Sequence, residues 1–181
     1  MILFTIGHSN HPIDRLLGLL MNHGIKLVVD VRSTPYSRFN PQYNQHSLQQ
    51  ALQAHGITYF FLGDALGGRP KDPACYIHHV VPTRSDDFVN EVDYPAVMQQ
   101  SWFLHGIQTL LELAGKEPTC ILCSEKDPVR CHRHHLVARY LLKKYPEMPI
   151  WHILPDSSLV NAAFLQAAES QTNPDQLSFD V

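Results

Sequence analysis

Two short clusters of polar residues have the types and spacing needed to bind or transform an anionic group. The first is Asp30-Val31-Arg32 and the second is Cys131-His132-Arg133. A guanidinium stays charged at any working pH and donates forked hydrogen bonds to phosphate or carboxylate. A thiol or an imidazole can act as a nucleophile or as a general acid or base. The two clusters therefore predict an anion-binding site, with Asp30, Arg32 and Arg133 binding the ligand and Cys131 and His132 as reactive groups.

Each cluster also has a structural interpretation. Asp30 and Arg32 occupy alternate positions at the end of an apolar run, so their side chains point the same way and could form an ion pair that braces a turn. Similarly, Cys131 could pack beneath a loop while Arg133 forms a salt bridge with Glu125. The sequence alone leaves the ion-pair lock and the ligand clamp open as alternatives.

Other polar residues are candidates because they follow predicted strands. His8 or Glu125 would handle a proton, and His152, which lies within a strand, is more typical of a hydrogen-bonded core histidine. Glycines can let a backbone approach a ligand, although Gly67-Gly68 is also typical of an ordinary turn. The remaining expected ligand-binding residues share small side chains that can donate hydrogen bonds or leave space: Ser9, Ser33, Ser37, Gly67 and Gly68.

Apolar runs alternate with amphipathic segments, and this alternation positions the candidate residues. Strands are predicted near 2–6, 27–31, 58–62, 119–123 and 149–154, with helices near 10–23, 46–55, 93–116 (in two pieces) and 130–144. This order predicts a Rossmann-like α/β fold in three layers, with a mostly parallel sheet and helices on both faces. Ligands of such sheets bind outside the carboxyl ends of the strands, where the polar clusters fall.

The chain length suits one domain, which we place at residues 1–155. Residues 63–92 show no sustained period and are expected to be a long loop that covers the site. Residues 156–181 are predicted to form a weak helix at 159–168 followed by a polar tail.

Composition excludes several classes of protein. The net charge of −3 argues against a broad nucleic-acid-binding face. No apolar stretch reaches the roughly 18 residues that a membrane span needs, and no basic region precedes the first apolar run, so we expect a cytoplasmic protein without a membrane partner. Free thiols are expected for the four cysteines.

No cofactor is evident from the sequence, and no metal ligands are predicted. Cys120-x-x-Cys123, with Cys131, His132 and His135 further along, has the residue types of a zinc site, but residues three apart in a strand face opposite sides of the sheet, so Cys120 and Cys123 cannot both reach one metal. We therefore predict that Cys120 is an inert core thiol. Metal assistance through Asp30 and Glu125 remains an alternative.

Four sequence blocks resemble the signature blocks of the DUF488 family. They are Thr5-Ile6-Gly7-His8-Ser9-Asn10, then Asp30-Val31-Arg32-Ser33-Thr34-Pro35-Tyr36-Ser37, then Tyr59-x-x-Leu62-Gly63-x-x-Leu66-Gly67-Gly68, and Leu122-Cys123-x-Glu125-x-x-x-x-x-Cys131-His132-Arg133. The final strand, His152-Ile153-Leu154, fits as well, and together these segments occur in order across about residues 2 to 155. The resemblance implies the α/β fold and the site, but it carries no established activity.

Two functions remain in view. The first is a hydrolase or group transferase acting on a small anionic ligand that bears a phosphate or carboxylate. The second is a non-enzymatic or accessory protein of nucleic-acid processing or DNA repair that reads phosphates in the same pocket. The tail could recruit such a protein, because Gln176, Leu177 and Phe179 lie in a segment similar to a shortened sliding-clamp-binding peptide. The preferred alternative is an ordinary tail whose Leu177 and Phe179 fold back onto the domain.

Overall fold

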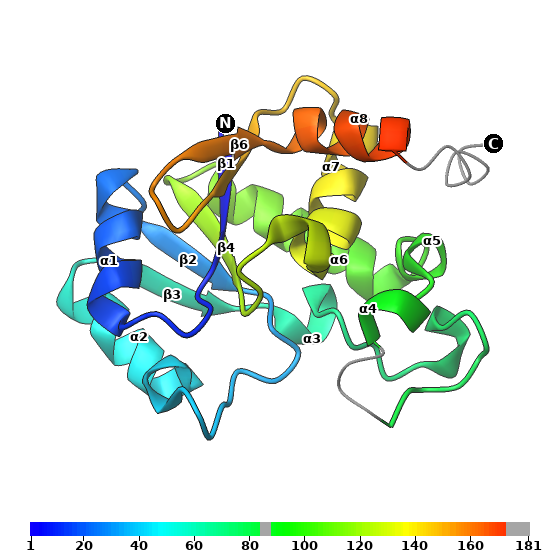
Figure 1. Cartoon of the computed structure of the whole chain (residues 1–181), viewed down its shortest axis with the longest axis horizontal. Helices are drawn as coiled ribbons and strands as arrows, with labels where there is room; N and C mark the ends of the chain where they lie inside the picture. The colour runs from blue at the N-terminus through cyan, green and yellow to red at the C-terminus, as the bar shows by residue number, and fades with distance from the viewer. Residues whose placement is uncertain (84–87, 173–181) are drawn as a thin grey trace.

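The computed structural model describes residues 1–83 and 88–172, and its centre is a six-stranded sheet in the order β3-β2-β4-β1-β5-β6 (Figure 1). The first five strands along the chain pair in parallel, and β6 pairs antiparallel with β5. The predicted, mostly parallel sheet is confirmed. The strands are β1 (Leu3–Gly7), β2 (Leu27–Asp30), β3 (Thr58–Phe61), β4 (Thr119–Cys123), β5 (Ile150–Ile153) and β6 (Leu159–Asn161).

Helices cover both faces of the sheet, so the three-layer prediction is also confirmed (Figure 1). On one face, α1 (Ile13–Asn22) and α2 (Gln45–Ala54) bury their leucines against Ile6, Val28 and Leu122. On the other face, α6 (Ser101–Ala114), the π-helix η4 (Arg133–Ala138) and α7 (Arg139–Lys144) pack against the opposite side chains of the same strands. All residues of β2 and β4 are buried, which accounts for their continuous apolar runs.

Residues 63–92 contain more regular structure than the sequence suggests. Within the described residues, three short helices break the segment, and Leu66, Cys75 and Tyr76 are buried in the core beside α6. The segment is therefore a packed part of the domain, and its first residues border the site. The short helices are α3 (Gly63–Leu66), η2 (Pro73–Cys75) and α4 (Phe88–Glu91), followed by α5 (Tyr94–Val97), which precedes α6 as the predicted first piece of two.

The predicted helix at 159–168 is wrong at its start. Residues 159–161 form the antiparallel edge strand β6, in which Leu159 pairs with Ile153, and α8 (Ala162–Thr172) begins only afterwards. The side chain of Asn161 accepts hydrogen bonds from the backbone N–H groups of Ala163 and Phe164, which caps the helix. A strand of three residues is too short to show a period of two. The tail residues Gln176, Leu177 and Phe179 lie outside the described residues.

All four cysteines are free and buried, as predicted. Cys120 packs in the cluster under α1 and α2, whereas Cys123 packs in the cluster under α6 and α7, so the two thiols do face opposite sides of the sheet. Within the described ranges, no helix is long and apolar enough to cross a membrane.

Candidate functional site

The polar clusters meet at the carboxyl edge of three neighbouring strands. β4 lies between β2 and β1, and backbone hydrogen bonds join His8 N to Cys123 O at 2.9 Å and Val31 N to Leu122 O at 3.1 Å. Because β2 pairs with β4, the strand before Arg32 neighbours the strand before the Cys131-His132-Arg133 cluster. The sheet topology alone therefore places most candidate residues at one edge.

Arg32 is buried, and its guanidinium is paired with a carboxylate. Its Nε donates to both carboxylate oxygens of Asp30 (2.9 and 3.1 Å), and its Nη2 donates to Oδ2 at 2.6 Å. Nη1 donates to the backbone carbonyl of Tyr43 at 2.8 Å, and the hydroxyl of Tyr59 donates to the same Asp30 Oδ2 at 2.8 Å. Asp30 and Arg32 thus form an ion pair that ties β2 to β3 and to the loop after β2, the geometry of the structural alternative.

His8 packs on this ion pair. Its ring stacks on Tyr43 with centroids 4.0 Å apart, and its Nδ1 lies 2.6 Å from the carbonyl of Ser9. Because a carbonyl can only accept, Nδ1 carries the proton, and Nε2 accepts from Arg32 Nη1 at 3.2 Å. Burial, with the nearby charge of Arg32, lowers the pKa of His8 to about 4. His8 is therefore neutral at pH 7, and its basic nitrogen already has a hydrogen-bond donor.

Arg133 has different partners. It is fully buried, its Nη1 donates to the backbone carbonyl of Glu125, and its Nη2 donates to that of Lys126 at 3.1 Å. Its Nε has no hydrogen-bond partner among the described residues, and no carboxylate there forms an ion pair with it. The alternative salt bridge between Arg133 and Glu125 is wrong. Glu125 contacts Arg133 through its backbone carbonyl, and the residue itself is exposed to solvent.

Gly7 shows how the loop after β4 comes so close. A Cβ at Gly7 would lie 1.7 Å from the carbonyl oxygen of Glu125 and 3.1 Å from Nη1 of Arg133. Any larger residue would push this carbonyl away from the guanidinium. The glycine at the end of β1 is thus needed for the packing that buries Arg133.

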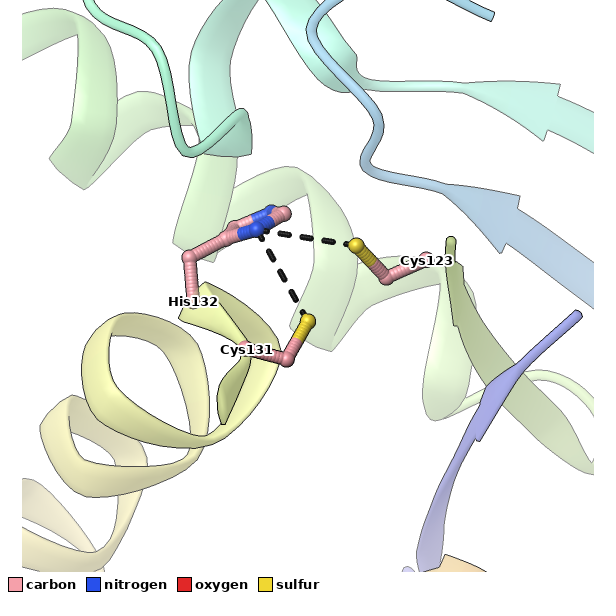
Figure 2. Close-up of side chains that lie close together, drawn as sticks. All are labelled: Cys123, Cys131 and His132. Carbon is pink, nitrogen blue, oxygen red and sulfur yellow. Dashed lines mark hydrogen bonds between the residues drawn. The ribbon is translucent and has the colours of Figure 1, made fainter. Parts of the chain in front are cut away.

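Cys123, Cys131 and His132 form a buried cluster of two thiols and an imidazole (Figure 2). The His132 Nδ1 lies 3.6 Å from the sulfur of Cys123 and 3.9 Å from that of Cys131. The three ligand atoms all lie within 4.8 Å of one another, so these side chains could hold a metal ion. Cys123 comes from the last residue of β4, and the other two come from the residues just before η4.

Of the two thiols, Cys131 is the one that loses its proton more readily. Burial raises the pKa of Cys131, but its hydrogen bond with Cys123 and the charge of Arg133 hold that pKa well below the ordinary value. The hydrogen bond with Cys131, together with burial, raises the pKa of Cys123. A thiolate on Cys131 is therefore one negative charge that could balance Arg133.

Gly67 and Gly68 allow the next segment to close over the cluster. A Cβ at Gly68 would lie 2.6 Å from Cγ of His132, and one at Gly67 would lie 2.3 Å from Oγ of Ser33. Ser33 Oγ also accepts from the backbone N–H of Arg69 at 2.9 Å. These three candidates are brought to the site, where they contact one another and His132.

Ser9 and Ser37 lie further from the cluster. Ser9 is half-buried at the edge, has a φ of 51°, and donates to Asn10 at 3.3 Å. Ser37 shapes the loop after β2, since its Oγ accepts from Asn40 N at 3.0 Å and its N–H donates to Asn44 at 2.7 Å. Both serines thus form hydrogen bonds within their own loops.

A broad open depression of about 2010 Å³ lies over α5, the loop after β4 and α7. Its lining includes six Lys or Arg side chains but three Asp or Glu side chains, although the whole chain has a net charge of −3. Tyr94 lines this depression and is also close enough to the two site thiols for their charge to act on it. The charged lining residues are Arg69, Lys126, Arg130, Arg139, Lys143, Lys144, Asp93, Glu125 and Asp127.

Sequence reasoning missed three tyrosines and one cysteine of the site. Tyr43 and Tyr59 hold Arg32 and Asp30. Tyr94 is near enough to the thiols for their charge to act on it, and its hydroxyl is buried and, within the described residues, without a hydrogen-bond partner. Burial and the nearby thiols raise the pKa of Tyr94. Cys123 was visible as the cysteine that precedes Glu125 in one signature block, but its strand position did not reveal that it faces Cys131.

The fold and the edge site define an α/β protein with a doubly wound, mostly parallel sheet. The sequence matches the family described as "Domain of unknown function DUF488" over residues 12–141, so the chain belongs to this family. No curated protein and no solved structure matches the chain.

Proposed function

We propose that the protein is an enzyme that hydrolyses, or transfers a group on, a phosphate-bearing or carboxylate-bearing substrate at this edge of the sheet. The observation that carries the proposal is Arg133, a buried guanidinium with an unpaired Nε and, in the described ranges, no acidic partner. A buried charge is costly unless it is paired, so an anion beside Arg133 would be stabilised.

The depression supports the anionic nature of the substrate. An excess of basic side chains raises the local concentration of anions even when the whole chain is acidic. Lys126 belongs to the loop whose carbonyls accept from the Arg133 guanidinium, and Arg130 follows a few residues later. The depression and Arg133 are therefore connected by one short segment. An anion could therefore approach over Tyr94 toward the cluster.

The reactive groups in this proposal are Cys131 and His132, with Glu125 for proton transfer. Glu125 lines the depression and is exposed, so its carboxylate can reach a bound substrate. His8 is less suited to the role of general base, because Arg32 already donates to its Nε2. In this proposal Asp30 and Arg32 hold the edge in shape rather than contacting the substrate.

The test is titration of metal-free protein with inorganic phosphate while thermal unfolding is followed. At ten times its dissociation constant, a bound anion stabilises the native state by about 1.4 kcal/mol, which raises the melting temperature by about 3–6 °C. Arg133→Met and the double variant Lys126→Gln/Arg130→Gln should lose most of this rise.

The control is Arg38→Gln, which removes an exposed arginine of the loop after β2 that does not line the depression. It should keep the full rise. Equal phosphate stabilisation in the wild type, Arg133→Met and the double variant would contradict the proposal. The double variant changes exposed side chains only, so it remains informative if Arg133→Met folds poorly.

A further inference from the structure

We propose that Cys123, Cys131 and His132 bind a zinc ion, leaving one coordination position open. Two thiolates and one imidazole are a donor set that zinc prefers, and three protein ligands plus an open position are the pattern of a catalytic rather than a structural site. In the zinc-bound protein Cys131 and His132 would be ligands, and a zinc-bound water would take their place as the reactive group. The proposal does not depend on the anion site, because it stands on the geometry of the three side chains and of their neighbours.

The distances already fit a tetrahedral ion. Zinc bound at about 2.3 Å to sulfur and about 2.0–2.1 Å to nitrogen places sulfur and nitrogen ligands about 3.6 Å apart, and two sulfurs about 3.8 Å apart. The structure has 3.6 and 3.9 Å between His132 Nδ1 and the two sulfurs, and all three ligand atoms within 4.8 Å. Only small side-chain movements separate this arrangement from a metal centre.

The second observation is the orientation of the His132 ring. Its Nε2 lies 3.1 Å from the backbone carbonyl of Val31, so Nε2 donates and the lone pair of the neutral ring is on Nδ1, the nitrogen that faces both sulfurs. Metal-binding histidines are usually held in this way, with the second nitrogen donating to a carbonyl or carboxylate. Gly68 lies against the same ring, so closely that an added Cβ would be 2.6 Å from Cγ of His132.

The neighbours of the cluster match what a metal with an open position would need. The hydroxyl of Tyr94, on which the charge of the two thiols acts, is buried without a hydrogen-bond partner among the described residues, so a ligand in the open position that extends toward it would give it one. Two thiolates neutralise a divalent ion, so Arg133 is left as the surplus positive charge. A hydroxide or an anionic group in the fourth position would balance it, and zinc would supply an activated water for hydrolysis.

Regular elements of the fold hold the ligands in place. Cys123 is fixed by β4 pairing on both sides, and Cys131 N donates to Pro128 O at 3.1 Å just before η4 begins. Ligands held by such elements are preorganised, so little conformational freedom is lost when the ion binds. π-helical turns such as η4 are also frequent at functional sites.

The experiment is a zinc titration of the reduced, chelator-treated full-length protein in phosphate-free buffer, with a chromogenic chelator as competitor. We expect one zinc per chain, and at least about 100-fold weaker binding in Cys123→Ser, Cys131→Ser and His132→Gln. Cobalt substitution of the wild type should give the intense visible bands of a tetrahedral site and a thiolate-to-metal band. The matched control is Cys120→Ala, which removes a buried thiol on the opposite face of β4 and should keep wild-type affinity.

Wild-type protein alone provides a second readout, in case the variants fold poorly. Bound zinc should slow alkylation of Cys123 and Cys131, identified by mass spectrometry, and leave Cys75 and Cys120 at their metal-free rates. The absence of stoichiometric zinc, or protection that is equal for all four cysteines, would overturn the proposal. Phosphate stabilisation of metal-free protein is measured separately, so failure of the zinc site and failure of the anion site are distinguishable.

Discussion

Arg32 and Arg133 are the same residue type and are both buried at one edge of the sheet, yet they have opposite surroundings. The guanidinium of Arg32 makes three contacts with the carboxylate of Asp30, and its remaining contacts are with a carbonyl and an imidazole nitrogen. Arg133 contacts two carbonyls, and its Nε has no hydrogen-bond partner among the described residues. The ion pair of Asp30 and Arg32 is complete without a ligand, whereas Arg133 carries a positive charge that only thiolates or a bound anion can balance. This difference is why we place the chemistry at Cys131 and not at Asp30.

The comparison is tested most sharply by removing the counter-ion of Arg32 in one variant and the guanidinium of Arg133 in another. Asp30→Asn should lower the free energy of unfolding by about 3–5 kcal/mol, because it leaves the buried charge of Arg32 without its counter-ion. Arg133→Met should cost about 1–3 kcal/mol, the cost of leaving the carbonyls of Glu125 and Lys126 unpaired. Urea denaturation measures both. Equal losses would mean that Arg133 is as fully compensated as Arg32, and the contrast would be lost.

The stability of the protein should also be sensitive to acid, because His8 packs on the ion pair of Asp30 and Arg32. The native pKa of about 4 lies below the ordinary value of 6.5, so between these pH values the unfolded chain binds more protons than the native protein. The stability that depends on neutral His8 is complete above pH 6.5 and is lost as the pH falls toward 4, by about 3 kcal/mol.

Denaturation measured from pH 7 to pH 4 in wild type and in His8→Gln checks this effect. The variant should lose less stability across the window, whereas His46→Gln, which changes an exposed histidine of α2, should follow the wild type. Parallel curves for His8→Gln and wild type would show that burial and Arg32 do not lower the pKa of His8 in the native protein.

Much of the fold could be predicted from the sequence because its physical causes are local. The runs at 27–31 and 119–123 are apolar almost throughout because both faces of β2 and β4 are covered, whereas a strand with one solvated face would alternate apolar and polar residues. β6 could not be predicted, because its three residues pair only with the edge of β5 and lead directly into a helix. The π-helical turn at η4 could not be predicted either, since five of its six residues are buried and leave no one-sided pattern from which its period could be read.

The site could be predicted as a place but not as a set of contacts. Strand ends determine where His8, Asp30 and Cys123 lie, and strand ends follow from apolar runs. The direction of the Glu125 side chain depends instead on how the loop after β4 passes Gly7, and the meeting of Cys123 with Cys131 depends on the turn at η3 (Pro128–Arg130) between them. Such loop paths are determined by tertiary packing, which residue types and spacing do not reveal.

The smallest expected effect concerns Gly68, in the segment that closes over the cluster of Cys123, Cys131 and His132. Gly68→Ala places a methyl group 2.6 Å from Cγ of His132, and that ring cannot move freely because its Nε2 is bonded to Val31 O. Overpacking of this kind should cost about 1–2 kcal/mol in the free energy of unfolding. Gly18→Ala is the matched control: nothing lies within 4 Å of its added methyl group, and in the interior of α1 it should stabilise the protein by about 0.5–1 kcal/mol. Thermal or urea unfolding of both variants measures the contrast. If Gly68→Ala is as harmless as Gly18→Ala, the 67–70 backbone yields without moving His132, and the imidazole is not held in place from that side. If it is destabilising, the ring is clamped between Gly68 and Val31, which is the condition for Nδ1 to stay aimed at the two sulfurs.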